Sequence, residues 1–201
     1  MEGGMKVKSR VETGIRVGVT GMPRAGTSLM MRIVGKLGCT IYGQKSVPHF
    51  SLKHNPGGYW ELHDYEVAKT RFEWNEDDND RVVKVFPMLI RQFPVDKYIV
   101  MARDIHDAAK SFQKVLTDAG SMDWCGTHKE FDGTYGEALY GVNANFSSAM
   151  HYVNKHKHSY IMVDFEELKK EPKKMIEKIA KYLEIGSTAK DIEDAAALVR
   201  R

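Results

Sequence analysis

The chain has 201 residues, 42% of them hydrophobic and 28% charged, so it suits a single folded domain with a sizeable core. Its 30 basic and 27 acidic residues leave a net charge of only +3, which argues against general nucleic-acid binding. Two cysteines are too few for a disulfide framework, and no apolar run suits a membrane helix or signal peptide, so we expect a cytoplasmic protein without a membrane anchor.

Hydrophobic patterning predicts alternating strands and helices after a loose lead-in at residues 1–14. Strands are expected at residues 15–20, 40–42, 81–86, 98–102 and 160–163. Helices are expected at residues 27–37, 61–74, 88–93, 105–118, 135–156, 173–183 and 189–199. This alternation predicts one α/β domain over residues 15–201, with a parallel sheet flanked by helices on both faces. Such sheets bind ligands beyond the carboxyl ends of their strands.

A glycine-rich loop lies between the first predicted strand and the first predicted helix. Gly21 and Gly26 have the spacing of a phosphate-binding loop, in which backbone N–H groups and a helix N-terminus surround an anion. A nucleotide triphosphatase would have Lys followed by Ser or Thr where Thr27 and Ser28 stand, and Arg24 lies inside the loop instead. The sequence therefore predicts a phosphate-type ligand other than ATP.

A second candidate anion site follows the predicted strand at residues 98–102. Arg103 comes directly after this strand, and Ser111 lies two turns into the next predicted helix. In a parallel sheet Arg103 shares the edge with the glycine loop, and a guanidinium with a hydroxyl suits a tetrahedral dianion. The alternative is a surface ion pair between Arg103 and Asp104 or Asp107.

These segments resemble the sulfotransferases that use 3′-phosphoadenosine 5′-phosphosulfate (PAPS). In that family a loop with the pattern G-x-P-[RK]-[SA]-G-T-[ST] holds the 5′-phosphosulfate, and residues 21–28, Gly-Met-Pro-Arg-Ala-Gly-Thr-Ser, match it. An Arg at a strand end and a Ser eight residues later hold the 3′-phosphate, which Arg103 and Ser111 match. Residues 160–186 are similar to a third stretch of the family, which has a strand, a (Y/F)E(D/E)L segment and a helix.

The resemblance implies a P-loop-like sulfotransferase architecture and transfer of a sulfuryl group from PAPS to a hydroxyl or amine, with no metal required. The acceptor class stays open between a small molecule, a glycan and a lipid. The residues assigned to the 5′-phosphosulfate are Pro23, Arg24, Ala25, Gly26, Thr27 and Ser28. The 3′-phosphate is assigned to Arg103 and Ser111, and Arg24 is also a candidate for catalysis.

Further catalytic candidates lie in residues 55–61 and in a predicted strand. Several branches of the family have a stretch like 55–61 in which a Glu is a candidate base for the acceptor, which here is Glu61. Alternatively, Glu61 is only a carboxylate placed favourably near a helix N-terminus. His63 and His49 compete with it as the base. Lys84 lies in an apolar strand, where lysine is costly unless it faces a polar site, and similar family segments lie near the transferred group.

Two other functions compete with the sulfotransferase interpretation. A P-loop nucleotide or small-molecule kinase would need ATP and magnesium, and Val163-Asp164 is the nearest candidate for its metal site. A non-catalytic relative would bind 3′-phosphoadenosine 5′-phosphate (PAP) without acting on any acceptor. His151, His156 and His158 have no carboxylate or cysteine at ligand spacing, so no metal site is expected. The chain also departs from the cytosolic branch, because it has no C-terminal RKG-like element to close over the nucleotide.

Overall fold

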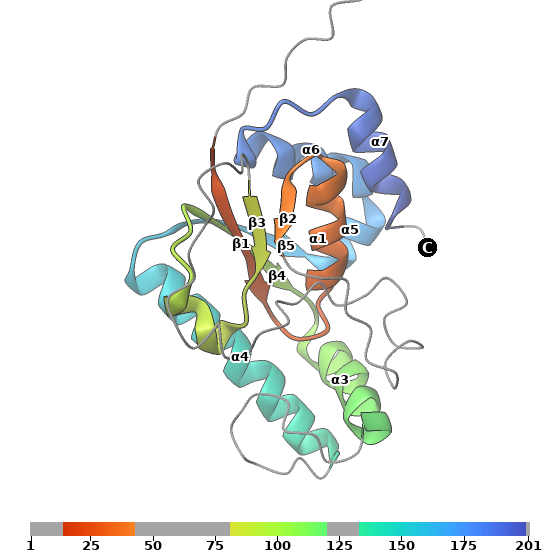
Figure 1. Ribbon diagram of the computed structural model, residues 1–201. Helices are drawn as coiled ribbons and strands as arrows, with labels where there is room; N and C mark the ends of the chain where they lie inside the picture. Colours follow the sequence, from red (N-terminus) through yellow and green to blue (C-terminus); the bar gives the residue numbers. More distant parts are fainter. Residues whose placement is uncertain (1–13, 43–80, 120–132, 200–201) are drawn as a thin grey trace, which may run out of the picture.

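The computed structural model describes residues 14–42, 81–119 and 133–199, which form one sheet with helices on both faces (Figure 1). The strands are β1 Arg16–Gly21, β2 Thr40–Tyr42, β3 Arg81–Lys84, β4 Lys97–Ala102 and β5 Ser159–Asp164. The helices are α1 Thr27–Lys36, the 3-10 helix η2 Pro87–Gln92, α3 Ile105–Ala119, α4 Tyr135–Lys155, α5 Phe165–Lys170, α6 Pro172–Leu183 and α7 Ala189–Ala197. None of these helices is both long and apolar enough to cross a membrane.

The five strands pair in the order β2-β3-β1-β4-β5, and every pair is parallel. Val19 of β1 lies opposite Lys84 at the end of β3, and Gly21 lies opposite Met101 near the end of β4. Because the strands are in this register, the carboxyl ends of β1, β3 and β4 meet at one edge of the sheet. The glycine loop, Lys84 and Arg103 are thereby brought together.

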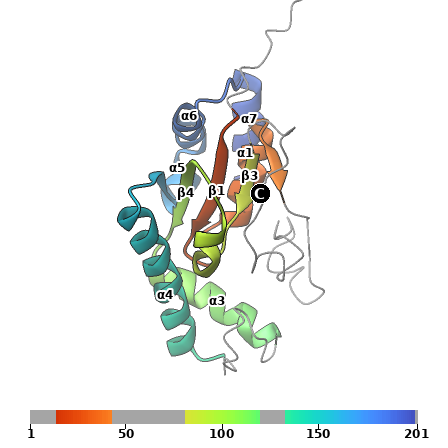
Figure 2. The same ribbon diagram turned by 60° about the vertical axis from the view of Figure 1, so that its left-hand side comes forward.

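Two apolar layers hold the sheet between its helices, and Figure 2 shows the sheet nearly edge-on between them. On one face Val17 and Val19 of β1 belong to a core with α1, α6 and α7. On the other face Val83 and Val100 pack with Ile90 of η2 and with the C-terminal half of α4. Burial on both faces explains why these strands are nearly continuous runs of β-branched and other apolar residues.

Strands β1 and β4 are also joined at their amino ends by hydrogen bonds and an ion pair. Asp96 precedes β4, and its two carboxylate oxygens accept hydrogen bonds from Nε and Nη2 of Arg16 at 3.1 and 2.9 Å. The backbone N–H of Arg16 donates to the same carboxylate at 2.9 Å. Burial alone would raise the pKa of Asp96, but these hydrogen bonds outweigh burial and leave the pKa below its usual value.

The structure differs from the predicted elements after β5. A separate short helix, α5, occupies residues that the patterning left outside any element. Asp164 begins it, because its Oδ1 accepts hydrogen bonds from the backbone N–H groups of Glu166 and Glu167, both at 2.9 Å. Asp164, considered above as a kinase metal ligand, is therefore an N-cap. Glu171 separates α5 from α6, and Pro172 begins α6 at a position that proline favours.

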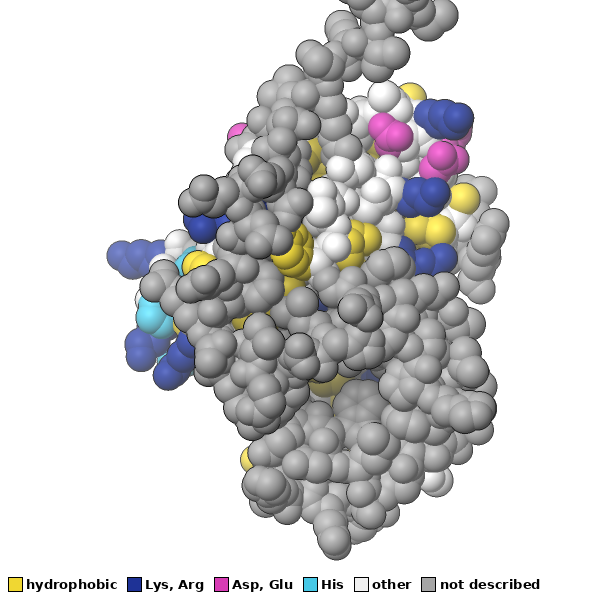
Figure 3. All heavy atoms as spheres, in the orientation of Figure 1, with side chains coloured by type: hydrophobic (Ala, Val, Ile, Leu, Met, Phe, Trp, Pro, Cys, Tyr) yellow, Lys and Arg dark blue, Asp and Glu magenta, His cyan; other side chains and the backbone are white. Residues whose placement is uncertain are grey.

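Histidine and lysine side chains gather where α4 ends, at the left of Figure 3. Lys155, His156 and Lys157 are exposed there, and cations near a helix C-terminus are favourable in any helix. The ring centroids of His156 and His158 lie 4.6 and 5.4 Å from that of Tyr152. Within the described ranges, no three His, Cys, Asp or Glu residues come together in a way that could hold a metal ion.

Candidate active site

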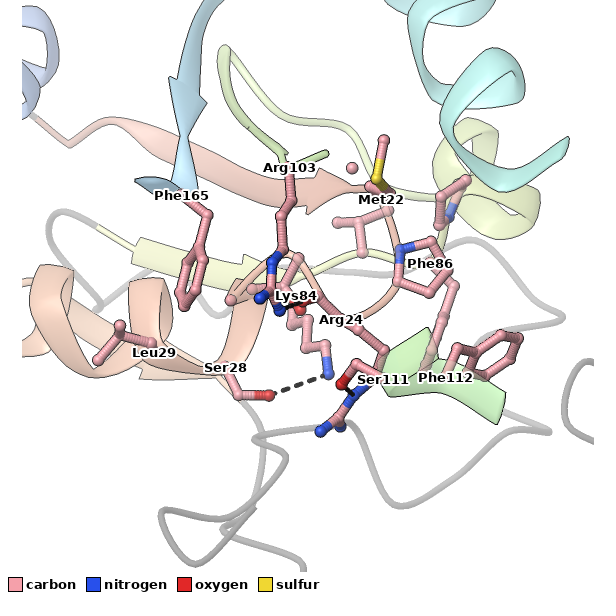
Figure 4. A pocket seen from close by; sticks show the side chains of 16 residues that line it. Met22, Arg24, Ser28, Leu29, Lys84, Phe86, Arg103, Ser111, Phe112 and Phe165 are labelled. Carbon is pink, nitrogen blue, oxygen red and sulfur yellow. Dashed lines mark hydrogen bonds between the residues drawn. The ribbon is translucent and has the colours of Figure 1, made fainter. Parts of the chain in front are cut away.

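A pocket of about 270 Å³ opens at the carboxyl edge of the sheet (Figure 4). Its walls come from the loop between β1 and α1, the first turn of α1, the end of β3 with the segment after it, Arg103 after β4, the middle of α3 and the start of α5. The predicted site residues within the described ranges all line it, apart from Ala25, which is fully buried in the loop. Parallel α/β sheets bind ligands at this edge.

The first residue of the glycine loop packs closely against the backbone of β4. Gly21 has φ 127°, and a Cβ added there would lie 2.2 Å from the carbonyl oxygen of Met101. The next residue, Met22, donates its backbone N–H to the same carbonyl oxygen at 2.9 Å. Only glycine fits this conformation and this close approach, so the sequence determines how the loop leaves the strand.

The rest of the loop has the backbone of an anion-binding concavity. Arg24 (φ 65°) and Gly26 (φ 89°) are left-handed and flank Ala25, which is not. Successive residues of opposite hand turn their N–H groups toward a common centre. Gly26 is also the N-cap of α1 and offers no side chain to cap it, and the first turn of α1 contains no acidic residue.

Two residues predicted to contact the nucleotide are already joined in the pocket. Nε of Arg24 donates a hydrogen bond to Oγ of Ser111 at 3.2 Å, as drawn in Figure 4. Nη1 of Arg103 lies 3.5 Å from the backbone oxygen of Arg24, a long hydrogen bond from the same region. The structure therefore places Arg24, Arg103 and Ser111 around one part of the pocket.

Lys84 reaches the pocket from the end of β3. Its Nζ donates to Oγ of Ser28 in the first turn of α1 at 3.3 Å, and it lies 5.6 Å from the ring centroid of Phe86. The unusual position of a lysine in an apolar strand is explained by this polar contact. Ser28 and Lys84 form the second polar part of the pocket.

Arg103 is held from a different direction by the start of α5. Its guanidinium lies 4.9 Å from the ring centroid of Phe165, and its Nε lies 3.4 Å from Oε1 of Glu166. The Phe165 ring also lies over the loop, because a Cβ at Gly26 would come within 2.7 Å of it. Asp104 instead caps α3, where hydrogen bonds from the N–H groups of Asp107 and His106 lower its pKa. Within the described ranges, the ion pair of Arg103 is with Glu166 and not with Asp104 or Asp107.

The described part of the pocket is strongly cationic. It is lined by Arg24, Lys84 and Arg103 and by no carboxylate. All three cations are partly buried, so solvent screens them less than it screens exposed charges. Donors of this kind, together with the loop amides, suit a ligand that has two separate anionic groups.

Several predictions concern residues that the structure does not place, and several lining residues were not predicted. Glu61, His63 and His49 lie outside the described residues, so the base that accepts the acceptor proton stays a prediction. The pocket is also lined by apolar side chains without a predicted role, which are Met22, Leu29, Val85, Phe86, Pro87, Phe112 and Phe165. Phe165 had a usable signal, since it follows a predicted strand that ends at the same edge.

A family model described as the sulfotransferase domain matches residues 15–200. A mouse sulfotransferase complexed with PAP aligns with a TM-score of 0.57 and 16% identity, over 92% of this chain and 63% of that one. A sulfotransferase from Alicyclobacillus acidocaldarius has a TM-score of 0.53 and 15% identity, with coverage of 83% and 79%. The sulfotransferase domain of an olefin synthase from Synechococcus PCC 7002 has a TM-score of 0.52 and 13% identity, with coverage of 89% and 75%.

These likenesses confirm the predicted α/β fold with a parallel sheet between helices. The chain spans only 63% of the length of the mouse protein, so that protein has segments without a counterpart here. No curated protein sequence matches the chain.

Proposed function

Because the chain belongs to the sulfotransferase domain family, we propose that it transfers the sulfuryl group of PAPS to a hydroxyl or amine acceptor. The products are the sulfated acceptor and PAP. The acceptor oxygen or nitrogen forms a bond to sulfur while the bond from sulfur to the phosphate oxygen breaks. The electron pair of that bond stays on PAP, and the acceptor proton goes to a base.

One observation carries this proposal: the pocket has two groups of anion donors. Thr27, Ser28 and Lys84 form the first group, with the loop amides and the N-terminus of α1. Arg103 and Ser111 form the second, and Arg24 contacts both of its members. PAPS has two anionic groups, a 5′-phosphosulfate and a 3′-phosphate, whereas ADP and ATP have phosphates at the 5′ position only.

We assign the 5′-phosphosulfate to the first group of donors. The loop residues Arg24 to Ser28 supply backbone N–H groups, and Lys84 supplies a cation for the sulfonate or the leaving phosphate. Group transfer of this kind has a loose transition state, in which positioning and charge stabilisation do most of the catalysis. Fixed donors that face the developing charge are the largest expected contribution.

We assign the 3′-phosphate to Arg103 and Ser111. A planar guanidinium and a hydroxyl together offer several donors to a tetrahedral dianion. This part of the pocket would therefore decide that the protein uses PAPS and not ATP. Arg24 belongs to the loop that supplies the first group and contacts both members of the second, so it can stabilise the negative charge on the leaving 5′-phosphate.

The proton acceptor and the acceptor class belong to the proposal as predictions. Glu61 is our first candidate for the base, with His63 and His49 as competitors. A single catalytic unit over residues 15–201 and a cytoplasmic location likewise stay predictions from the sequence.

The proposal is tested by titrating the purified protein with PAP and with ADP in a calorimeter, without magnesium. We expect PAP to bind at least roughly tenfold more tightly, because only PAP presents a 3′-phosphate to charge-assisted donors. Turnover of PAPS with a panel of phenols, alcohols, amines and sugars would then identify the acceptor class. Equal binding of PAP and ADP, or ATP binding only with magnesium, would overturn the proposal and favour a kinase. Tight PAP binding without turnover of any acceptor would favour the non-catalytic alternative.

A further inference from the structure

Two residues at the start of α5 contact the guanidinium of Arg103. Phe165 lies against the guanidinium at 4.9 Å, and Glu166 Oε1 lies 3.4 Å from Nε. Lys169 completes the group, because its Nζ contacts Oε2 of Glu166 at 2.8 Å and lies 5.5 Å from the Phe165 ring centroid. A carboxylate thus lies between two cations that share one aromatic ring.

We propose that Glu166 is a positioning residue that holds the Arg103 guanidinium in the orientation that binds the 3′-phosphate. Through Arg103, Glu166 then contributes to the preference for 3′-phosphorylated nucleotides. This inference rests on the function proposed above. It adds to that function a residue that neither lines the pocket nor touches the nucleotide.

The contacts of Arg103 show how this positioning works. Its Nε side faces Glu166, its Nη1 faces the backbone oxygen of Arg24, and its planar face lies on Phe165. Among the described residues only Nη1 donates a hydrogen bond, and the contact of Nε with Glu166 at 3.4 Å is an ion pair without a hydrogen bond. The Nη2 end of the guanidinium is left for a ligand. An arginine that is already oriented loses less conformational freedom when it binds a phosphate.

Glu166 is itself well fixed, as a positioning residue must be. Its backbone N–H is bound by Asp164 at the start of α5, and its second carboxylate oxygen is held by Lys169 one turn later. Both of these contacts of Glu166 are made by α5 and its N-cap residue. The orientation of Arg103 is then set by where α5 begins at the end of β5.

A second effect of Glu166 has the opposite sign, which makes the proposal testable. A carboxylate near an anion site repels every anionic ligand, so its removal would strengthen the binding of PAP and ADP alike. Glu166 is 45% exposed, and salt should weaken this repulsion. Loss of positioning would instead weaken PAP binding selectively and at all salt concentrations.

The test compares Glu166→Gln, Glu166→Asp and the matched control Glu167→Gln, an exposed neighbour on the same helix. Each protein is titrated with PAP and with ADP in 50 and 300 mM salt, and its thermal unfolding is recorded. We expect Glu166→Gln to weaken PAP binding by roughly tenfold, as for loss of a charge-assisted contact, with ADP binding changed less than about twofold. Glu166→Asp should recover part of the loss, and Glu167→Gln should bind as the unaltered protein does.

A second set of variants separates positioning from a general effect on the fold. In an Arg103→Ala background, Glu166→Gln should no longer weaken PAP binding, because the positioning effect of Glu166 acts only through Arg103. Unchanged or tighter PAP binding by the single Glu166→Gln variant would overturn the proposal, as would an equal loss for PAP and ADP. Equal binding of PAP and ADP by the unaltered protein would instead overturn the proposed function, and the positioning role with it.

Discussion

Arg24 of the glycine loop and Ser111 of α3 are joined by a hydrogen bond of 3.2 Å across 87 positions of sequence. The bond links the glycine loop, whose amides belong to the first group of anion donors, to Ser111 of the second group. A phosphate that enters this part of the pocket must share or replace the bond. When this bond breaks, Arg24 and Ser111 both lose a hydrogen-bond partner. A substitution of either residue therefore also affects the other.

Ser111→Ala should weaken PAP binding by roughly tenfold, since a hydrogen bond to a charged group contributes about 1.5 kcal/mol. ADP binding should change little, because Ser111 is assigned to the 3′-phosphate. Calorimetry with both nucleotides measures the effect, and Ser148→Ala, on the exposed surface of α4, is the control. A variant that loses PAP and ADP affinity in equal measure would contradict the assignment.

Lys84→Met should lower turnover of PAPS by roughly a hundredfold, the scale observed when one donor to developing charge is removed. Methionine keeps the length of the side chain and suits the apolar strand, so stability should not fall. Single-turnover kinetics at saturating PAPS measures the effect, with Lys114→Met on the exposed face of α3 as control. Unchanged turnover in the Lys84 variant would remove it from the mechanism.

Glu61→Gln should reduce turnover and remove the acidic limb of its pH profile, if Glu61 is the base. A solvated Glu has a pKa of about 4.3, so an effective base needs a pKa raised by burial. His63→Gln and His49→Gln are the matched comparisons, since histidine would instead give a limb near about 6.5. If only a histidine variant loses the acidic limb of its pH profile, that histidine and not Glu61 is the base.

Gly21→Ala should destabilise the protein by about 3 kcal/mol, since a Cβ at this position overlaps backbone atoms and the conformation is one that alanine avoids. The nearest atoms are the carbonyl oxygen and the nitrogen of Met101, at 2.2 and 2.6 Å. Gly14→Ala is the control, because Gly14 has φ 66° but no atom within 4 Å of the added Cβ. Urea unfolding compares the two, and similar losses would mean that backbone conformation, not the clash, dominates.

Asp96→Asn should lower stability at pH 7 by about 1 kcal/mol, the scale of a partly exposed ion pair. The pKa of Asp96 is lowered in the folded protein, so its contribution is present above the unfolded pKa of about 3.9. This contribution is lost as the pH falls through the folded pKa. The difference between the variant and the unaltered protein should therefore narrow between pH 5 and pH 2 in urea unfolding. Asp194→Asn, exposed on α7, serves as control, and a difference that widens in acid would contradict the argument.

The sequence was sufficient to predict the parallel sheet and the glycine loop at its carboxyl edge, because both predictions depend on local patterns. Gly21 and Gly26 have a spacing that requires a tight strand-to-helix turn, and Arg103 directly follows an apolar run. In a parallel sheet these two facts are enough to bring the loop and Arg103 together. The predicted helix at residues 61–74 lies outside the described residues and stays a prediction.

Contacts between distant segments could not be predicted in the same way. The sequence offers Asp104 and Asp107 as neighbours for Arg103, but both lie at the start of α3 and Asp104 caps it. Glu166 becomes the partner of Arg103 only because β5 pairs with β4 and ends at the same edge. The whole of α5 was missed, since residues 165–170 were left outside any predicted element. Its start is defined by the cap at Asp164, a contact between a side chain and backbone N–H groups.

At position 24, the backbone conformation favours glycine, whereas the proposed chemistry uses arginine. A residue with a side chain at φ 65° is less stable there than glycine by about 1 kcal/mol. Arg24→Gly would thus relax the loop while it removes the guanidinium that bonds to Ser111. A library of variants sorted by heat resistance should drift away from arginine at position 24. The same library sorted by growth on the sulfated product should retain arginine at position 24. The two selections would therefore enrich different residues at this position.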